Sequence, residues 1–441
     1  MEARVLMASN RTKMSHEFHE LRIRGVGRIR PRRYGGSVYL YVLASSLLVT
    51  ILGLGSLAAV RIQMRSARLA RDSAEARACA VSAIELGRLQ IKQNSSWRTT
   101  YPNGTWLDNK ELGAGRFTLV GTDPTDGVLN DSVYEPLVLT GIGTRGIARH
   151  KAQVTLVPVI KPLALLSTCL RASGQVQVTL AQQVIAIGAP LSTNGPIVDN
   201  GAIDGDVQAQ SISPSGCSIS GSWTVPGPSM PMPDAAVFTD YISKATSVPY
   251  EAMIQKVALA PGCNPLGATD PNGFYVIDTG GRDLAIRNSR VYGTLIIRAA
   301  GRTVTVDEAM FMQNYRSDAP VLLVEGNLLI KLNSIAGPLW EGGAVNANFN
   351  PVGAPYNGVT DPDKTDQYPN EIRGLVHVKG TLTLQQTARI VGTVICEGPV
   401  SCEGTNTTII YDAGLYANPP KGYTYVDGMK VSPGTWKQVV D

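Results

Sequence analysis

The chain has 441 residues, with 44% hydrophobic residues, 17% charged residues and a formal net charge of +5. This length leaves room for two or three domains, and the composition suits a folded chain that lies mostly outside a membrane. The 45 glycines and 27 prolines, against 6% aromatic residues, favour many short strands and turns over a helical bundle.

The positive charge belongs to an N-terminal tail, residues 1–37. Residues 1–35 hold nine Lys or Arg and three Glu, which leaves 31 basic and 32 acidic residues in the remainder. The net charge therefore gives no evidence for a nucleic-acid surface further along the chain, and we expect no nucleic-acid partner. Positive charge beside a membrane span predicts that the tail lies in the cytoplasm.

Residues 38–60, VYLYVLASSLLVTILGLGSLAAV, contain no charged residue. As a helix they would be about 34 Å long, which is enough to cross the hydrocarbon of a bilayer. A cleaved secretory signal has a shorter apolar core, although Ser56-Leu57-Ala58 does offer a small-x-small triplet. We therefore predict an uncleaved single-pass anchor in membrane lipid, with the N-terminus inside and the C-terminal part outside.

Residues 61–93 are predicted to continue the same helix, because they contain no proline and a single glycine. Apolar residues recur at spacings of three, four and seven and give the helix one apolar face. This face consists of Leu69, Ala76, Ala80, Ile84, Gly87 and Ile91. Asn94 and Pro102 favour an end to the helix soon after residue 93. Two interpretations remain open: a stalk beside the membrane, or a spine packed on a small β domain.

Three short strands are predicted between residues 112 and 160: 116–120, 134–140 and 147–160. Residues 141–146, GIGTRG, formally match the GxGxxG pattern of dinucleotide-binding proteins. That pattern requires a helix to follow it, whereas a strand follows here, so we expect a hairpin turn. Residues 61–160 are therefore predicted to be one helix and a small antiparallel sheet.

Residues 161–441 alternate short β-prone segments with Gly, Asn and Asp turns. In residues 374–412 glycines recur at multiples of six, and aliphatic residues alternate with polar ones between them. Stacked coils of a β-solenoid need this pattern, and we predict a right-handed solenoid, with a β-sandwich as the alternative. Loop excursions are expected near 225–270 and 337–370. The predicted fold class is thus mainly β with one long N-terminal α-helix.

Residues Gly35-Gly36-Ser37-Val38 follow a basic run and precede the span, the helix and the small sheet. This plan resembles that of type IV pilin-like proteins over about residues 30–160, and most closely PilX-type pilus assembly proteins and minor pseudopilins. The resemblance implies cleavage by the prepilin peptidase between Gly36 and Ser37. The family's Glu, fifth after the cut, is replaced by Tyr41, which favours a minor or tip component, or an uncleaved anchor, over a major self-polymerising subunit.

The resemblance implies a bacterial protein of the cytoplasmic (inner) membrane that acts in assembly of a type IV pilus or a type II secretion pseudopilus. Its implied partners are other pilin-like subunits or pilus and secretion assembly proteins. Small residues at Ser45, Gly53 and Gly55 would let partner helices approach within the membrane.

An enzymatic role or glycan binding by an adhesin is the alternative, because many β-solenoids degrade acidic polysaccharides. The candidate charged residues are Asp278, Arg282, Asp283, Arg287 and Arg290. Charged residues in such strands are more often solvated side chains on outward-facing positions than members of an active site. We find no catalytic motif and expect no catalytic residue and no cofactor. His16 and His19 lack the zinc-protease spacing.

Two Asp-rich segments could offer oxygen ligands to Ca²⁺, but neither follows the EF-hand pattern, so we expect metal at neither. They are Asp123, Asp126 and Asp131, and Asp361, Asp363 and Asp366. The six cysteines are too widely spaced for a CxxC motif. Cys396 and Cys402 flank a Gly-Pro turn, so a local disulfide is one option beside isolated buried thiols.

Overall fold

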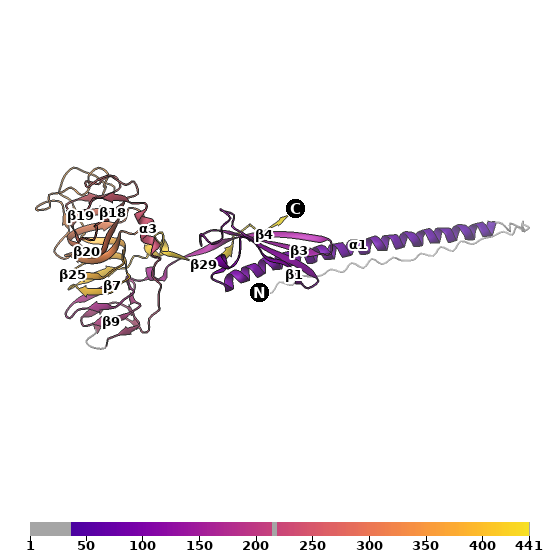
Figure 1. The fold of residues 1–441 in the computed structure, drawn as a ribbon, viewed down its shortest axis with the longest axis horizontal. Helices are drawn as coiled ribbons and strands as arrows, with labels where there is room; N and C mark the ends of the chain where they lie inside the picture. The colour runs from indigo at the N-terminus through magenta and orange to yellow at the C-terminus, as the bar shows by residue number, and fades with distance from the viewer. Residues whose placement is uncertain (1–36, 214–217, 441) are drawn as a thin grey trace, which may run out of the picture.

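The computed structural model describes residues 37–213 and 218–440. The molecule is elongated (Figure 1). A long helix forms one end, an antiparallel sheet lies in the middle, and a stack of parallel strands stands crosswise at the other end. This arrangement confirms the predicted class: mainly β, with one long N-terminal helix, a small antiparallel sheet and a solenoid-like domain.

The first element is a single uninterrupted helix, α1 (Ser37–Gln93), which joins the two segments predicted at 38–60 and 61–93. It contains no proline, so nothing in the backbone forces a break. Asn94 follows the last helical residue, and its side-chain oxygen accepts a hydrogen bond from the backbone N–H of Ser96 at 2.9 Å. A short helix, α2 (Trp97–Thr100), follows this turn.

The antiparallel sheet has the order β1-β2-β3-β4-β29, and β30 also pairs with β4. Its strands are β1 (Gly104–Leu112), β2 (Gly115–Thr122), β3 (Leu137–Arg145), β4 (Ala148–Pro162), β29 (Thr424–Val431) and β30 (Lys437–Val439). β3 and β4 form a tight hairpin in which Arg145 pairs with Ala148, and Gly146 has a positive φ of 56°. The GIGTRG segment is therefore part of a hairpin, as predicted.

The second half of α1 packs on this sheet through very small side chains. Ala76 and Ala80 are fully buried, and Gly141 and Gly143 of β3 face them. A Cβ at Gly141 would lie 2.0 Å from the carbonyl oxygen of Ala80, and one at Gly143 would lie 1.9 Å from that of Ala76. These glycines are thus required for the close approach of helix and strand, which explains the pattern that mimicked a nucleotide-binding motif.

The predicted apolar face of α1 is buried from Ala76 to Ile91, whereas Leu69 is exposed. The sheet ends beside Asp72 and Glu75, where the guanidinium of Arg145 meets both carboxylates at 3.6 and 3.0 Å. Leu69 lies beyond this point, so the periodicity of the face continues further than the sheet that covers it.

The C-terminal bound of the predicted solenoid, residue 441, needs correction. Residues 424–439 do not add coils; β29 and β30 return to the antiparallel sheet and pair with the free edge of β4. An open edge strand presents unpaired backbone groups, and the returning strands satisfy them. The solenoid is therefore inserted between β4 and β29, two neighbouring strands.

The solenoid sheet contains 22 strands. They are β5 (Leu170–Ala172), β6 (Val176–Val178), β7 (Gln183–Ile187), β8 (Leu191–Thr193), β9 (Pro196–Asp199), β10 (Ala202–Asp204), β11 (Val207–Gln208), β12 (Ser211–Ile212), β13 (Ser218–Ile219), β14 (Trp223–Thr224), β15 (Thr246–Val248), β16 (Met253–Gln255), β17 (Ala258–Leu259), β18 (Phe274–Asp278), β19 (Leu284–Tyr292), β20 (Thr294–Gln313), β21 (Leu322–Leu332), β24 (Glu371–Val378), β25 (Leu382–Gln385), β26 (Arg389–Cys396), β27 (Val400–Glu403) and β28 (Thr407–Ile410). Successive coils pair in parallel, and Gly374 lies opposite Gly392, so the glycine repeat marks equivalent positions of stacked coils.

The coils do not stack in the order of the sequence. β5, β6 and β7 pair with β26, β27 and β28 on one side and with β8, β9 and β10 on the other. The coils of residues 170–224 therefore extend in one direction from the middle of the stack, and those of residues 246–385 fill the other direction (Figure 1). The chain crosses between the two ends through residues 225–245.

The predicted excursion at 225–270 is only partly correct. Residues 225–245 do leave the wall of the solenoid, which is the surface formed by its stacked strands, and they contain α3 (Ala236–Ile242). However, β15, β16 and β17 are paired strands of the solenoid. Their hydrophobic runs are short and Pro-flanked, which obscured the pattern. The second excursion, 337–370, leaves the wall as predicted and carries a two-stranded piece, β22 (Leu339–Trp340) with β23 (Gln367–Tyr368).

The outer face of the solenoid nearest the antiparallel sheet is covered by α3, by the 3-10 helix η1 (Ala164–Ser167) and by α4 (Gly414–Ala417). The two connectors between the sheet and the solenoid lie side by side, because the N–H of Leu163 donates to the carbonyl oxygen of Tyr423 at 2.9 Å. Tyr423 is fully buried.

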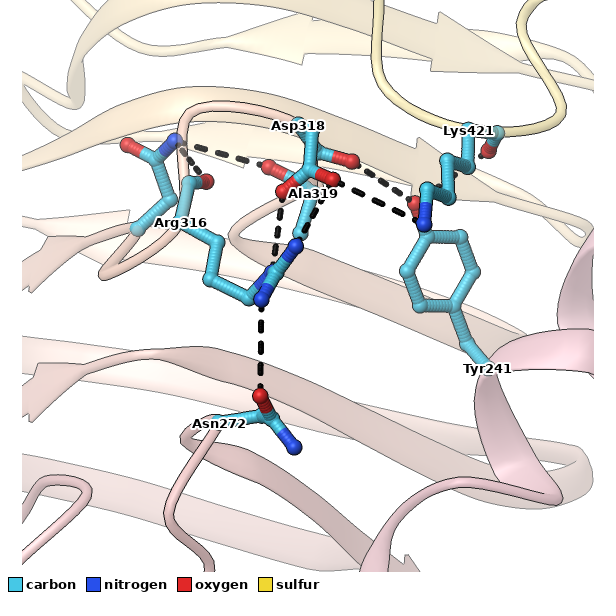
Figure 2. A network of polar contacts seen from close by, with 7 residues as sticks. Tyr241, Asn272, Arg316, Asp318, Ala319 and Lys421 are labelled. Atoms are coloured by element: carbon cyan, nitrogen blue, oxygen red, sulfur yellow. Dashed lines mark hydrogen bonds and ion pairs between the residues drawn. The ribbon is translucent and has the colours of Figure 1, made fainter.

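Figure 2 shows the polar network that holds the returning connector and α3 to the solenoid. Arg316 binds Asp318 through two hydrogen bonds of 2.9 Å, and Lys421 lies 3.9 Å from the same carboxylate. The hydroxyl of Tyr241 donates to the carbonyl oxygens of Asp318 (3.3 Å) and Lys421 (3.2 Å). The bond from Arg316 lowers the pKa of Asp318, so this carboxylate stays charged.

The disulfide option between Cys396 and Cys402 is wrong. Cys396 is a free, fully buried thiol whose sulfur lies 3.2 Å from the carbonyl oxygen of Gly380. Burial raises the pKa of this thiol to about 12. The isolated-thiol alternative therefore holds for Cys396.

Candidate functional site: the exposed half of the long helix

The most distinctive surface of the molecule is the first half of α1. Every residue from 38 to 71 is exposed in the described chain, including those of the uncharged segment 38–60. The large apolar side chains among them are Val38, Tyr39, Leu40, Tyr41, Val42, Leu43, Leu47, Leu48, Val49, Ile51, Leu52, Leu54, Leu57 and Val60. Figure 1 shows this half projecting from the sheet. In water such a surface is strongly unfavourable, whereas a bilayer or partner helices would cover it.

The serine and threonine hydroxyls of this segment are satisfied within the helix. The hydroxyls of Ser45 and Ser56 donate to the carbonyl oxygens of Val42 (3.0 Å) and Gly53 (2.8 Å). The hydroxyl of Thr50 donates to its own helix in the same way, at 2.7 Å. Because these groups already have partners, they can enter hydrocarbon without leaving an unpaired donor.

The predicted packing residues Ser45, Gly53 and Gly55 all lie on this exposed half. Among the described residues, a Cβ at Gly53 or at Gly55 would meet nothing within 4 Å. Neither glycine is therefore needed for packing against the described part of the chain, in contrast to Gly141. Small side chains on an exposed apolar helix create a shallow surface on which another helix can lie.

The predicted peptidase site is described only in part. α1 begins at Ser37, and Gly36 lies outside the described residues, as do His16 and His19. Tyr41, which replaces the Glu of the pilin pattern, lies on the exposed apolar surface.

The five charged residues considered for polysaccharide degradation do not form one cluster. Asp278 pairs with Arg298 at 2.8 Å, and Arg282 stacks on the ring of Tyr250. Asp283 accepts a hydrogen bond from a backbone N–H at 3.0 Å. Each of these three therefore has a structural partner of its own.

Arg290 is buried and binds backbone carbonyl groups of the excursion 337–370. It is 1% exposed, and its Nη1 donates to the carbonyl oxygens of Phe349 (2.8 Å) and Ala354 (2.7 Å). Its Nη2 donates to the carbonyl oxygen of Pro355 at 2.6 Å. This guanidinium holds the excursion 337–370 to the solenoid wall.

Arg287, the fifth candidate, pairs at 2.8 Å with Glu308, which lines an open polar cavity of about 470 Å³ beside β20 and β21. The cavity is lined by Asn288, Asp307, Glu308, Ala309, Lys331, Asn333, Ala336, Gly337, Pro338, Asn370 and Gln386. Oδ1 of Asp307 is buried without a hydrogen-bond donor and lies 3.5 Å from Nε of Arg287. Burial raises the pKa of Asp307. Sequence reasoning identified Arg287 but missed the cavity, because its lining comes from distant coils.

The two Asp-rich segments differ in structure. Asp361 and Asp366 accept hydrogen bonds from the side chain of Asn350 at 2.9 and 2.8 Å, and Asp363 accepts one from the N–H of Thr365. They therefore order the excursion.

The other Asp-rich segment brings Asp123, Asp126 and Asp131 together with Glu135, which sequence reasoning had not included. The only sequence signal for this fourth carboxylate was its place in the same loop.

No family model and no curated protein matches this chain. Solved structures similar to it include the competence-associated pilin ComZ from Thermus thermophilus, with 12% identity, 84% of this chain and 98% of that chain covered, and a TM-score of 0.30. An ice-binding protein from an Antarctic biological consortium has 12% identity, covers 57% of this chain and 91% of that chain, and has a TM-score of 0.30. An ice-binding protein of Shewanella frigidimarina has 12% identity, covers 58% and 98%, and has a TM-score of 0.24. The chain itself has one long helix packed on an antiparallel sheet, followed by a parallel β-solenoid-like domain.

Proposed function

We propose that this protein is a membrane-anchored, pilin-like envelope protein without catalytic activity, and a minor component in assembly of a type IV pilus or a type II secretion pseudopilus. The observation that carries the proposal is the division of α1 into two halves. Its second half is buried against the sheet, and its first half is uncharged from 38 to 60 and exposed on all sides.

The exposed half accounts for membrane insertion. Burying one large apolar side chain contributes about 1.5–3 kcal/mol, so its many such side chains strongly favour transfer into hydrocarbon. The basic tail before the span favours an inside N-terminus, which places the sheet and the solenoid outside the cytoplasmic membrane. The small residues Ser45, Gly53 and Gly55 then allow close approach of pilin-like partner helices, with Gly53 and Gly55, two residues apart, on different sides of α1.

N-terminal sequencing of the membrane-extracted full-length product tests the processed form of this proposal. A new amino terminus at Ser37 would support cleavage by a prepilin peptidase and a role as a filament subunit. An intact tail would contradict processing and leave an uncleaved anchor. Freely dissolved protein after lysis without detergent would contradict the whole proposal.

A second candidate function is glycan binding by the solenoid, which the cavity around Asp307 and Glu308 favours. Carboxylate, amide and ammonium groups converge there, and such groups hydrogen-bond sugar hydroxyls. Incubating the full-length protein with a glycan panel distinguishes the functions. Binding that is lost in Asp307→Asn would support an adhesin, turnover would support an enzyme, and neither is expected of a purely structural subunit.

A further inference from the structure

The loop between β2 and β3, residues 123–136, gathers four carboxylates at one point. Asp123, Asp126, Asp131 and Glu135 each offer one side-chain oxygen, and these four oxygens lie within 4.8 Å of one another. Like charges at such distances repel one another, so the arrangement requires a compensating cation or protons.

One of these side chains is buried and incompletely satisfied. Asp123 is 6% exposed, and its Oδ1 accepts a hydrogen bond from the N–H of Thr125 at 2.6 Å. Its Oδ2 is buried and has no hydrogen-bond donor, and the same holds for Oε2 of Glu135. Buried carboxylate oxygens without a partner are costly, so these two atoms point to a ligand that the oxygens would bind.

The nearby guanidinium does not supply this partner. Arg98 is buried, its Nη1 donates to the carbonyl oxygen of Leu129 at 3.2 Å, and its Nη2 donates to the carbonyl oxygen of Glu135. It therefore fixes the backbone of the loop, and its single positive charge is shared among Asp123, Glu135 and Asp131.

We propose that this loop binds one Ca²⁺ ion through the carboxylates of Asp123, Asp126, Asp131 and Glu135. Calcium takes six to eight oxygen ligands at about 2.3–2.6 Å, so two oxygens that share the ion lie no more than about 5 Å apart. The four oxygens meet this condition, and water would complete the shell. Mg²⁺ is a poorer fit, because it demands near-ideal octahedral geometry and keeps most of its own water.

The bound ion would order the loop at the end of the sheet. Leu129, in the middle of the loop, is 3% exposed and belongs to the core beneath α1 and the sheet. Trp97 lies in the same core. Calcium would therefore stabilise the packing between α1 and the sheet, whatever filament or membrane role the chain has.

The competing explanation is a proton shared between Glu135 and Asp123. Burial, followed by the charges of Asp131 and Asp123, raises the pKa of Glu135. A shared proton would relieve the repulsion without any metal, and it predicts no response to calcium.

The test uses full-length protein in detergent, stripped with EGTA and desalted. Calorimetric titration with CaCl₂ at pH 7.5 should show one ion per chain, and a saturating concentration should raise the unfolding temperature by about 3 °C or more. MgCl₂ should bind at least tenfold more weakly. Absence of calcium binding, or equal binding of both ions, would overturn the proposal.

Two exposed ligands allow a test that does not depend on a buried substitution. Asp126→Asn and Asp131→Asn should each weaken calcium binding at least tenfold, and neither should lower the unfolding temperature in EGTA by more than about 1 °C, because each removes one of the repelling charges. Asp108→Asn on β1 is the matched control and should bind calcium normally. Unchanged affinity in both loop variants would place the ion elsewhere and reject this site.

Discussion

The two halves of α1 share one continuous backbone but have different surroundings. The second half presents Ala76, Ala80 and Ala83 to a sheet whose glycines let the backbones approach closely. The first half presents large apolar side chains to no part of the described chain. Close packing against a fixed partner thus selects small residues at defined positions, whereas lipid selects bulk and the absence of charge. The glycines make the contrast sharpest, because Gly141 has no space for a methyl group and Gly53 has open space around it.

The largest effect is expected from Gly141→Ala. The added Cβ would lie 2.0 Å from the backbone oxygen of Ala80, and because backbone cannot rotate away, the cost should be about 3 kcal/mol or more. Thermal unfolding of the full-length protein in detergent measures it. The matched control is Gly53→Ala, which should not lower stability, since alanine favours a helix over glycine by about 1 kcal/mol. An equal response of the two variants would remove the distinction between the halves.

A second large effect is expected from Leu48→Lys, near the middle of the uncharged segment, and a smaller effect in the same direction from Val42→Lys, near its start. A lysine at the centre of a membrane helix costs about 3 kcal/mol on insertion scales. The fraction of protein in carbonate-washed membranes should fall, and co-purification of pilin-like partners should fall with it. Gln63→Lys, beyond the segment, is the control. Full membrane retention of both lysine variants would argue against insertion of this half.

Gly53→Leu should have a smaller and more selective effect. A bulky side chain would fill the shallow surface proposed for partner helices and weaken their association by about 1 kcal/mol. Membrane retention and thermal unfolding should stay at parental levels, because a Cβ at this position meets no described residue within 4 Å. Co-purification with partners, compared with that of Leu54→Met, measures the difference. Normal partner recovery would show that this side of the helix faces lipid alone.

The smallest effect is expected from protonation of His377, a buried residue of the solenoid. His377 is 1% exposed, its Nδ1 lies 2.9 Å from the hydroxyl of Tyr423, and its Nε2 lies 3.1 Å from Glu397. Burial lowers the pKa of His377, so below about pH 6.5 the unfolded chain binds the proton more readily and stability falls with falling pH.

The difference in unfolding temperature between pH 7.5 and 5.5 should therefore be smaller in His377→Gln than in the parent. Each tenfold change in the proton affinity of this imidazole on unfolding corresponds to about 1.4 kcal/mol. An identical pH response of the two proteins would show that His377 is not the group responsible.

Local pattern predicted the helix and the existence of the solenoid. The uncharged run 38–60 and the repeat of Ala76, Ala80 and Ile84 gave the helix, and the glycines of 374–412 gave the stacked coils. Both signals depend on residues close in sequence, where periodicity reports the secondary structure directly. The hairpin at Gly146 followed from the strand after it.

The pairing of strands that lie far apart in the sequence could not be predicted from local pattern. The alternation in residues 424–431 suits a strand, but nothing local shows that its partner is β4 rather than another coil. The order of the coils was hidden for the same reason, since β5 pairs with β26 across more than half of the chain. The grouping of Glu135 with the three aspartates depends on how the loop folds. The cavity beside Asp307 likewise depends on tertiary folding.

The insertion of the solenoid between β4 and β29 has a consequence for how the molecule can vary. Both connectors join the stack at its centre, where residues 170–187 meet 389–410, so neither end of the stack is occupied by the attachment. Coils can be gained or lost at either end of the stack while the two connectors stay in place. The length of the solenoid can therefore change without any change in α1 and the antiparallel sheet that carry it.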